Sequence, residues 1–315
     1  MKRYFVLFGV VIVLMLFAAR KESDKHVDID KVEHGHIVHR QKKDTTLLRS
    51  TSNTTTASVQ ENYNSTKKIN DIEEEMSKQI LMVFDNILKG AWKSIDLTSY
   101  NKLTRGLTLT SKPLAEGHSA QLVKERQLYV ALAKLPFVRN ICEIGFNGGH
   151  SAGLWLLANP TASVTMFDIW THPYTVPAEA FLRSPEAKQY GIVNGDKRLT
   201  IIKGSSHVTL KPYAVQNPKS CDIISVDGDH SHDGAVLDLR DVFPLARDEK
   251  TIILLDDTNC ISSWCVDNAM KQVISEGYYE KLLGISEADR TRGVSLLKPI
   301  QQTQTNIEVI DEVLK

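Results

Sequence analysis

The chain has 315 residues, which is more than one typical domain, but its composition is uneven, and one catalytic-sized domain plus accessory sequence fits better than two cores. Its 38 Lys and Arg balance its 38 Asp and Glu, and no block of five like charges occurs. This balance argues against a surface for nucleic acid or acidic lipid, and we expect no nucleic-acid partner.

The N-terminus has the pattern of a membrane-inserting segment. A basic start, Met1-Lys2-Arg3, precedes an uncharged apolar run over residues 4–19. As a helix this run extends about 24 Å, against a hydrocarbon core of roughly 30 Å. We interpret residues 1–20 as an uncleaved signal anchor, because cuts after Ala18 or Ala19 lack the second small residue of an Ala-x-Ala site.

The charge of this N-terminal segment also predicts an orientation. Basic residues on its short leading side favour an N-terminus that stays in the cytosol. We therefore expect a single-pass type II membrane protein of the endoplasmic reticulum or Golgi, with its domain in the lumen. Cleavage of the signal followed by secretion is the alternative that the sequence leaves open.

The remaining chain divides by composition. Residues 21–70 are polar, rich in Ser and Thr and without periodicity, which predicts a solvated stem that carries two sequons, at Asn53 and Asn64. Residues 71–118 are interpreted as a helical extension, residues 119–300 as the folded domain and residues 301–315 as a weakly ordered tail.

Four cysteines lie in the folded domain without metal or redox spacing. We interpret Cys142, Cys221, Cys260 and Cys265 mainly as core residues. A bridge between Cys260 and Cys265 in an oxidising lumen stays open, because sequence does not show whether their side chains meet.

Short apolar strands alternate with helical segments through the folded domain. This alternation predicts a parallel sheet with helical crossovers, an α/β fold. A first helix, over residues 119–135, ends at Pro136. The expected parallel strands are 140–144, 163–168, 199–203, 222–226 and 251–255. Closing strands are expected at 279–284 and 294–297, on either side of a polar turn. Further helices are expected at 150–158, near 178–190, near 234–242 and at about 264–276, with a short helix after residue 205.

The turn after the first strand predicts a nucleotide-like ligand. Its sequence, Glu143-Ile144-Gly145-Phe146-Asn147-Gly148-Gly149, lies where an open parallel sheet binds ligands. Asn147 replaces the second glycine of the dinucleotide fingerprint, so no pyrophosphate site is implied. Glu143 can instead face an α-amino group, and Gly145 and Gly149 leave room for an amino-acid moiety. An ordinary strand-turn-helix is the alternative.

Two further strand ends extend this site. Asp168 ends the second strand about twenty residues beyond the loop, where a carboxylate can accept both hydroxyls of a ribose, although a helix cap explains it too. After the third strand, Ser205 and Ser206 offer hydroxyl and backbone groups beside an adenine, or simply cap a helix. The joint spacing carries more weight than each part.

Three motifs together resemble a known family. They are Cys142-Glu143-Ile144-Gly145 through Ser151, then Val226-Asp227-Gly228-Asp229-His230, then Leu255-Asp256-Asp257-Thr258. Over residues 122–300 the chain resembles the class I methyltransferases, and within them the macrocin O-methyltransferase-like and catechol-type metal-dependent branch. The resemblance implies a Rossmann-like, seven-stranded, mostly parallel sheet. It also implies S-adenosylmethionine as the methyl donor, with Asn147 and Asp227 among the residues around it.

The resemblance further implies a divalent metal. In that branch, one carboxylate after strand four and two adjacent residues after strand five hold the ion, which implies Asp227, Asp256 and Asp257 as ligands of Mg²⁺. Three carboxyls at neighbouring strand ends converge, and such oxygens suit an octahedral Mg²⁺ site. A metal-bound acceptor hydroxyl would have a lowered pKa. Capping and surface roles for these acids are the alternative.

The proton acceptor has two candidates. Resemblance favours Asp229 as the base, and His230 is the alternative because a neutral imidazole has a more convenient pKa. Asp256-Asp257 stands where catechol-type enzymes usually have Asp-Asn and agrees with the sugar-modifying branch.

These features predict an S-adenosylmethionine-dependent, Mg²⁺-assisted O-methyltransferase for a saccharide or other diol in the secretory lumen. A small catechol or phenol acceptor is the second interpretation. A membrane-tethered binding protein that keeps the fold without turnover is the third. The oligomeric state is not predicted.

Overall fold

The computed structural model describes residues 75, 78, 82–110, 119 and 122–300. The predicted anchor, the stem with its sequons and the C-terminal tail lie outside these residues. Within the described part, no helix is both long and apolar enough to cross a bilayer.

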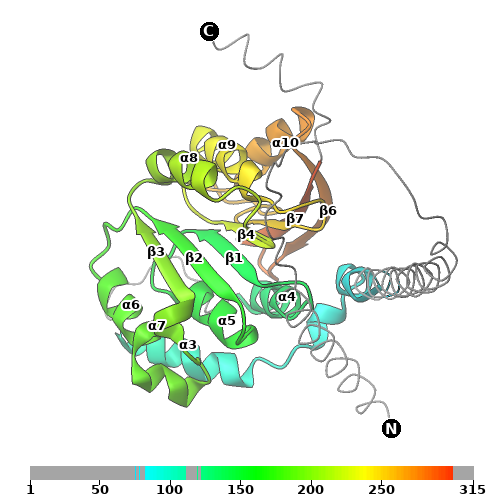
Figure 1. The fold of residues 1–315 in the computed structure, drawn as a ribbon. Coiled ribbons are helices and arrows are strands. Elements are labelled where there is room, and N and C mark those ends of the chain that lie inside the picture. Colours follow the sequence, from blue (N-terminus) through cyan, green and yellow to red (C-terminus); the bar gives the residue numbers. More distant parts are fainter. Residues whose placement is uncertain (1–74, 76–77, 79–81, 111–118, 120–121, 301–315) are drawn as a thin grey trace, which may run out of the picture. The chain divides into compact units, whose positions relative to one another are not determined.

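Seven strands form one mixed sheet (Figure 1). Its order is β3-β2-β1-β4-β5-β7-β6, in which the first five strands are parallel and β7 runs antiparallel to both β5 and β6. The seven-stranded, mostly parallel sheet is thereby confirmed. The strands are β1 Asn140–Ile144, β2 Ser163–Asp168, β3 Leu199–Lys203, β4 Ile223–Val226, β5 Ile252–Leu255, β6 Tyr279–Ser286 and β7 Gly293–Pro299.

Helices cover both faces of the sheet, as a parallel sheet with crossovers requires (Figure 1). Side chains alternate along the strands, so that Ile141 and Ile223 belong to one buried cluster while Cys142 and Ile224 belong to the other. On the first face lie α3 Thr98–Thr110, α4 Val123–Ala133, α5 His150–Ala158, α6 Thr175–Arg183 and α7 Gly195–Arg198. On the second lie α8 Ser206–Gln216, α9 His232–Val242 and α10 Asp267–Ser275.

Two helices differ from the prediction. The helix expected near residues 178–190 is interrupted, because α6 ends before Ser184, whose extended backbone precedes Pro185. A residue before proline avoids the helical region, and the chain resumes as the 3₁₀ helix η3, Pro185–Tyr190. The helix after Ser205 is longer than expected, since α8 has 11 residues and contains Pro212.

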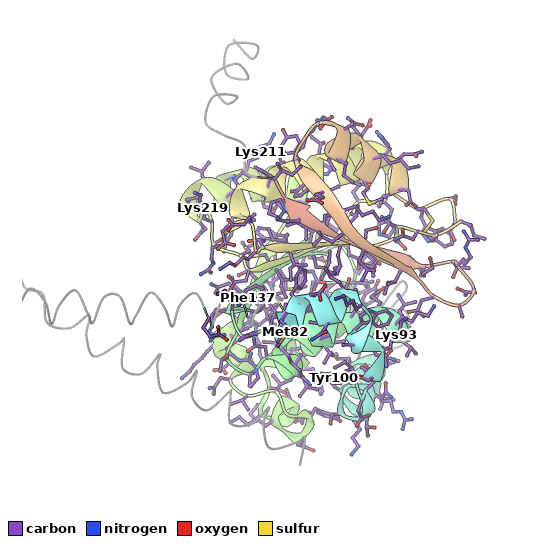
Figure 2. The ribbon with its side chains drawn as sticks, turned by 90° about the vertical axis from the view of Figure 1, so that its right-hand side faces the viewer. Met82, Lys93, Tyr100, Phe137, Lys211 and Lys219 are labelled. Atoms are coloured by element: carbon purple, nitrogen blue, oxygen red, sulfur yellow. A yellow bond between two sulfur atoms is a disulfide. The ribbon has the colours of Figure 1, made fainter. Side chains whose placement is uncertain are left out.

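The N-terminal extension is helical where the structure describes it. Residues 82–88 are helical, and the 3₁₀ helix η1, Ala91–Ser94, and α3 follow. Gln127 of α4 donates hydrogen bonds of 3.0 Å to the carbonyls of both Lys93 and Ile95, which fastens this extension to the domain. Figure 2 shows Lys93 and Tyr100 on this side and Lys211 on the opposite side.

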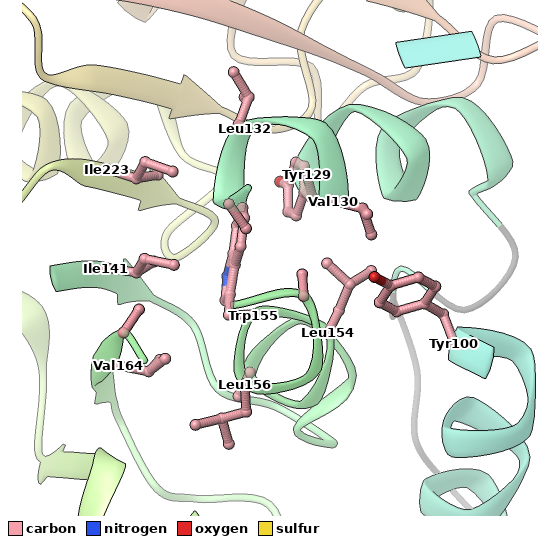
Figure 3. Packing of buried hydrophobic residues seen from close by; sticks show 14 of the residues in the cluster. Tyr100, Tyr129, Val130, Leu132, Ile141, Leu154, Trp155, Leu156, Val164 and Ile223 are labelled. Atoms are coloured by element: carbon pink, nitrogen blue, oxygen red, sulfur yellow. The ribbon is translucent and has the colours of Figure 1, made fainter. Parts of the chain in front are cut away.

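One core contact connects packing to the site. Trp155 of α5 is fully buried and stacks on Tyr129 of α4, with ring centroids 4.6 Å apart (Figure 3). Its indole nitrogen donates a hydrogen bond of 3.2 Å to the Glu143 carboxylate. The apolar core therefore also orients an acid at the end of β1.

All four cysteines form disulfides, and Cys142 and Cys221 are core residues as predicted, whereas the Cys260–Cys265 bridge is the alternative that the sequence left open. Cys142 of β1 is bonded to Cys221, which precedes β4, and both are buried. Cys260 is bonded to Cys265 in the loop between β5 and α10. The first bridge was not predicted, because spacing in sequence does not show that β1 and β4 are neighbours.

Candidate active site

A cavity of about 600 Å³ opens at the carboxyl ends of the parallel strands. This is the edge at which open α/β sheets bind ligands. Residues that follow β1, β2, β3, β4 and β5 line it, together with Arg292 from the turn before β7. The residues that line this cavity include Gly145, Asp168, Ser205, Ser206, Asp227, Asp229, His230, Trp264 and Arg292.

The glycine loop approaches β4 so closely that no side chain fits at Gly145. Gly145 has a φ of 100°, and a Cβ built there would lie 2.0 Å from the backbone oxygen of Asp227. Gly149, with a φ of 72°, precedes α5 and is also in the left-handed region. The loop therefore requires glycine for both conformation and space.

Asp168 holds the loop in place as well as lining the cavity. Its Oδ2 accepts hydrogen bonds from the backbone N–H groups of Phe146, at 2.8 Å, and Asn147, at 3.0 Å. Its Oδ1 accepts one of 2.6 Å from Trp170. Asp168, which the sequence predicts to contact a ribose, thus also positions the loop, and the sequence did not indicate this.

Glu143 is a buried acid with one oxygen to spare. Its Oε2 accepts hydrogen bonds from Ser151, at 2.9 Å, and Trp155, while its Oε1 has no hydrogen-bond partner within the described structure. Burial raises the pKa of Glu143 to about 8. A small cavity beside it is also lined by Glu125 and Tyr129. An unpaired buried carboxyl oxygen of this kind favours a cationic ligand group.

Aromatic side chains and hydroxyls surround the other end of the loop. Ser205, Ser206, His172 and Tyr174 line the cavity, and the last two rings stack with centroids 5.0 Å apart. Trp170 is not among the lining residues, and its ring instead contacts the ammonium of Lys203 and packs on Phe146.

His230 lies between two acids and lines the cavity. Its Nε2 is 3.4 Å from Asp227 Oδ1, and its Nδ1 is 3.3 Å from Asp257 Oδ2. The hydrogen bond with Asp227 raises the pKa of His230 above its ordinary value. Asp257 is itself held by Arg292, whose Nη1 lies 2.6 Å and 2.9 Å from its two oxygens.

Asp229 also lines the cavity but is engaged locally. Its Oδ1 accepts a hydrogen bond of 2.8 Å from the backbone N–H of Ser231, the residue before α9. Partial burial opposes the effect, but the hydrogen bonds from Ser231 lower the pKa of Asp229. A more acidic carboxyl is a weaker proton acceptor.

Asp227, His230 and Asp257 form a close group that does not include Asp256. One donor atom of each of those three residues falls within 4.8 Å of the others, and Asp256 is not in the group. Asp256 and Glu125 are buried side chains beside each other. Burial raises the pKa of both carboxyls well above the ordinary range. The charge of Glu125 adds to the rise at Asp256, whereas the hydrogen bond with Asp256 lowers the pKa of Glu125.

The structure therefore brings most predicted site residues to one cavity. Gly145, Asn147, Asp168, Ser205, Ser206, Asp227, Asp229 and His230 all line it, and Glu143 and Gly149 are adjacent. Sequence reasoning missed Arg292, Trp264 and Glu125. Glu125 had a signal, since it precedes Leu128 and Leu132 by three and seven residues on the apolar face of its helix. Arg292 and Trp264 lie in loops, where no periodicity marks them.

Comparison with known protein families agrees with the methyltransferase domain that the sequence predicts. The model of a family described as a methyltransferase domain matches residues 142–258. This segment contains all three motifs of the predicted site and the strands from β1 to β5. Over these residues the match agrees with the expected methyltransferase domain. No curated protein matches the sequence.

Solved structures show likeness in fold. The S-adenosylhomocysteine-bound methyltransferase PaMTH1 of Podospora anserina has 18% identity and a TM-score of 0.46, covering 69% of this chain and 95% of its own. Cofactor-bound Rv0187 from MTB has 19% identity and a TM-score of 0.49, covering 70% of this chain and 97% of its own. A caffeoyl-CoA O-methyltransferase homologue from Staphylococcus aureus gives 16%, 0.47, 64% and 92%. These likenesses identify no acceptor for this chain.

Proposed function

We propose that this chain, whose residues 142–258 form a methyltransferase domain, transfers a methyl group from S-adenosylmethionine to a hydroxyl of a saccharide or other diol. The observation that carries the proposal is one continuous cavity. It joins a loop suited to the donor, at Gly145 and Asp168, to an acid and imidazole cluster suited to the acceptor, at Asp227 and His230.

The donor end matches the parts of S-adenosylmethionine. Glu143 offers its unpaired Oε1 to the α-ammonium group. Asp168 would accept hydrogen bonds from the ribose hydroxyls, and Ser205 and Ser206 would contact the adenine, since all three residues line the cavity. These residues lie at or near the ends of sheet strands, which fix their positions. Cofactor binding therefore costs little conformational entropy at these residues.

The acceptor end supplies a base. We assign this role to His230, because Asp227 and Asp257 hold its two nitrogens and orient the ring at the cavity wall. For this step the acceptor has to replace one of the two carboxylate contacts, so that a nitrogen of the neutral imidazole is free to take the hydroxyl proton as the oxygen attacks the methyl carbon. The carbon–sulfur bond breaks to leave S-adenosylhomocysteine. Asp229 is less suited, since its carboxylate already accepts the Ser231 N–H and its pKa is lowered.

The same cluster fits a divalent cation. The cluster contains four carboxyls, those of Glu125, Asp227, Asp256 and Asp257. Two of them, Asp227 and Asp257, are in contact with a basic side chain, which is His230 or Arg292. Asp256 Oδ1 is buried without a hydrogen-bond partner in the described structure. Asp227 and Asp257, with Asp256 beside them, would hold Mg²⁺, which prefers carboxylate oxygens. When bound, the ion would polarise the acceptor hydroxyl.

Labelled-methyl transfer with a chelator control tests this proposal. Calorimetry should show S-adenosylmethionine binding to the folded chain, and transfer should follow with some member of a panel of glycosides and catechols. Failure of the folded protein to bind S-adenosylmethionine would contradict the function. Transfer that survives both chelator and Asp256→Ala would remove only the metal role.

We also propose that the domain works in a secretory lumen, as a type II membrane protein. The two disulfides in the described residues support this proposal, because such bonds persist in oxidising compartments. Endoglycosidase treatment of the full chain from microsomes tests it through Asn53 and Asn64. We expect a mobility shift that Asn53→Gln and Asn64→Gln abolish. A chain that carries no glycans and whose domain is digested by protease added outside the microsomes would instead place the domain in the cytosol.

A further inference from the structure

The loop between β5 and α10 is built as a rigid element at the acceptor end. The Cys260–Cys265 disulfide closes it across five residues of sequence separation. The backbone N–H of Ile261 donates to Arg290, and the Ser262 hydroxyl donates to Thr291, each at 3.1 Å. The loop is thus tied to itself and to the turn before β7.

This rigid loop presents one aromatic ring to the cavity. Trp264 lines the cavity while its side chain remains 40% exposed, which is unusual for so large an apolar group. The guanidinium carbon of Arg292 lies 5.1 Å from its ring centroid. Arg292 is also anchored on Asp257, which contacts the proposed base, His230, so that the cation connects the ring to the base through Asp257.

The surroundings of Trp264 indicate what its ring receives. Arg292 contacts the ring, and the lining residues that follow β4 include the polar side chains of Asp227, Asp229 and His230. The other aromatic lining residues, Phe167, His172 and Tyr174, lie in β2 or follow it. A flat catechol favours apolar contact on both of its faces. A pyranose has a face of C–H groups and a rim of hydroxyls, which matches one aromatic wall and several polar ones.

We infer that Trp264, held by the Cys260–Cys265 loop and Arg292, is the platform on which the sugar ring of a pyranoside acceptor stacks. This inference rests on the proposed function and specifies its acceptor. It makes Trp264 a substrate-contacting residue and the disulfide a positioning element. Neither has a role in holding S-adenosylmethionine.

Steady-state kinetics of full-length variants, produced with both disulfides formed, test the platform. The probes are methyl glycopyranosides and a catechol. Trp264→Ala should raise KM for the accepted pyranoside about three- to tenfold, with kcat and S-adenosylmethionine affinity unchanged. Trp264→Phe should recover most of the loss. Ile261→Ala is the matched control, since Ile261 is on the same loop, is 69% exposed and does not line the cavity.

The positioning role of the disulfide has its own variant. Cys260→Ser combined with Cys265→Ser should shift KM in the same direction as Trp264→Ala and leave the melting temperature with bound cofactor nearly unchanged. A KM that is equal in wild type and Trp264→Ala overturns the platform. Transfer to the catechol with none to any pyranoside overturns the sugar class while the methyltransferase function stands.

Direct binding separates this inference from the proposed function. If S-adenosylmethionine binds but no panel member is methylated, saturation-transfer NMR with the same pyranosides still decides. Transfer of saturation to the sugar C–H protons in wild type, lost in Trp264→Ala and kept in Ile261→Ala, supports the platform without turnover. Equal signals in wild type and Trp264→Ala contradict it.

Discussion

The donor end of the cavity is held by backbone geometry, whereas the acceptor end is held by ionised side chains. At the donor end, Gly145 lies against the backbone of Asp227, and Asp168 binds two loop N–H groups. At the acceptor end, His230 and Arg292 take their positions from contacts with Asp257.

The difference explains why the two ends respond differently to substitution. A backbone-built site fails when space or conformation is lost, and the fold suffers with it. A site built from ion pairs can lose its chemistry while the fold survives, because the partners are side chains at a cavity wall. The following predictions test this contrast, from the largest expected effect to the smallest.

Replacing the base should affect chemistry most. We expect His230→Asn to lower kcat by about 10²- to 10⁴-fold, the usual contribution of general acid–base catalysis, while S-adenosylmethionine affinity stays within about threefold. Rapid-quench measurement of methyl transfer checks the chemical step. Asp229→Asn is the matched control and should retain most activity. The reverse pattern would assign the base to Asp229 instead.

Replacing the loop glycine should affect stability. Gly145→Ala places a Cβ 2.0 Å from a backbone oxygen at a φ of 100°, so we expect a loss of about 2–4 kcal/mol in the free energy of unfolding together with weakened cofactor binding. Urea denaturation measures the loss. Gly277→Ala separates clash from backbone strain, because Gly277 has a φ of 83° but nothing within 4 Å of its Cβ position.

For Gly277→Ala we expect about 1 kcal/mol, from the left-handed conformation alone. Equal losses in the two variants would show that the close approach of the loop to β4 is unimportant.

Removing the charge of Asp168 should weaken the donor end moderately. Asp168→Asn loses charge-assisted hydrogen bonds to Phe146 and Asn147, and we expect S-adenosylmethionine affinity to fall about ten- to hundredfold. Calorimetry measures it. Pyranoside affinity, measured by NMR without the cofactor, should not change, and an equal loss there would show that the two ends are not independent.

The titration of Glu143 should appear as a proton linked to cofactor binding. Burial raises its folded pKa from 4.5 to about 8, so the native state without ligand keeps a proton that the unfolded chain loses. Its contribution to stability is therefore lost as pH rises from about 4.5 to about 8. An α-ammonium group beside Glu143 favours the ionised form and expels that proton.

Calorimetry at pH 7 in buffers of different ionisation enthalpy measures the release, which we expect to approach one proton per cofactor bound. Glu143→Gln should abolish it and flatten the fall in stability between pH 5 and pH 8. Binding without proton release in wild type would mean that the carboxyl already ionises in the free protein.

Most of the sheet followed from local pattern. The bounds of β1, β2 and β3 agree with the predicted ranges, since short apolar runs between turn residues leave few alternatives. The donor loop also followed, because a tight turn between a strand and a helix requires glycine at particular positions. α3 lies in the extension that was predicted to be helical, but its bounds were not predicted, because its burial depends on contact of Leu103 and Leu107 with Gly153.

The acceptor end was predicted only in part. Asp227, Asp256 and Asp257 were named together because strand ends converge, but Asp256 is outside the close group that His230 forms with the other two, and it contacts Glu125 of α4. The position of the side chain depends on which partner reaches it, and Glu125 is 131 residues away in sequence. The same holds for Arg292, which comes from the turn before β7 and neutralises Asp257.

Periodicity, glycine spacing and strand-end acids were thus sufficient to predict the strands along the chain and the donor loop. Each of these features depends on neighbours within a few residues. The Cys142–Cys221 bridge, the contacts of His230 with Asp227 and Asp257, and the placement of Trp264 beside Arg292 required the folded chain. Electrostatic and covalent partners are chosen by distance in space, and that distance exists only once the sheet has brought its strand ends to one edge.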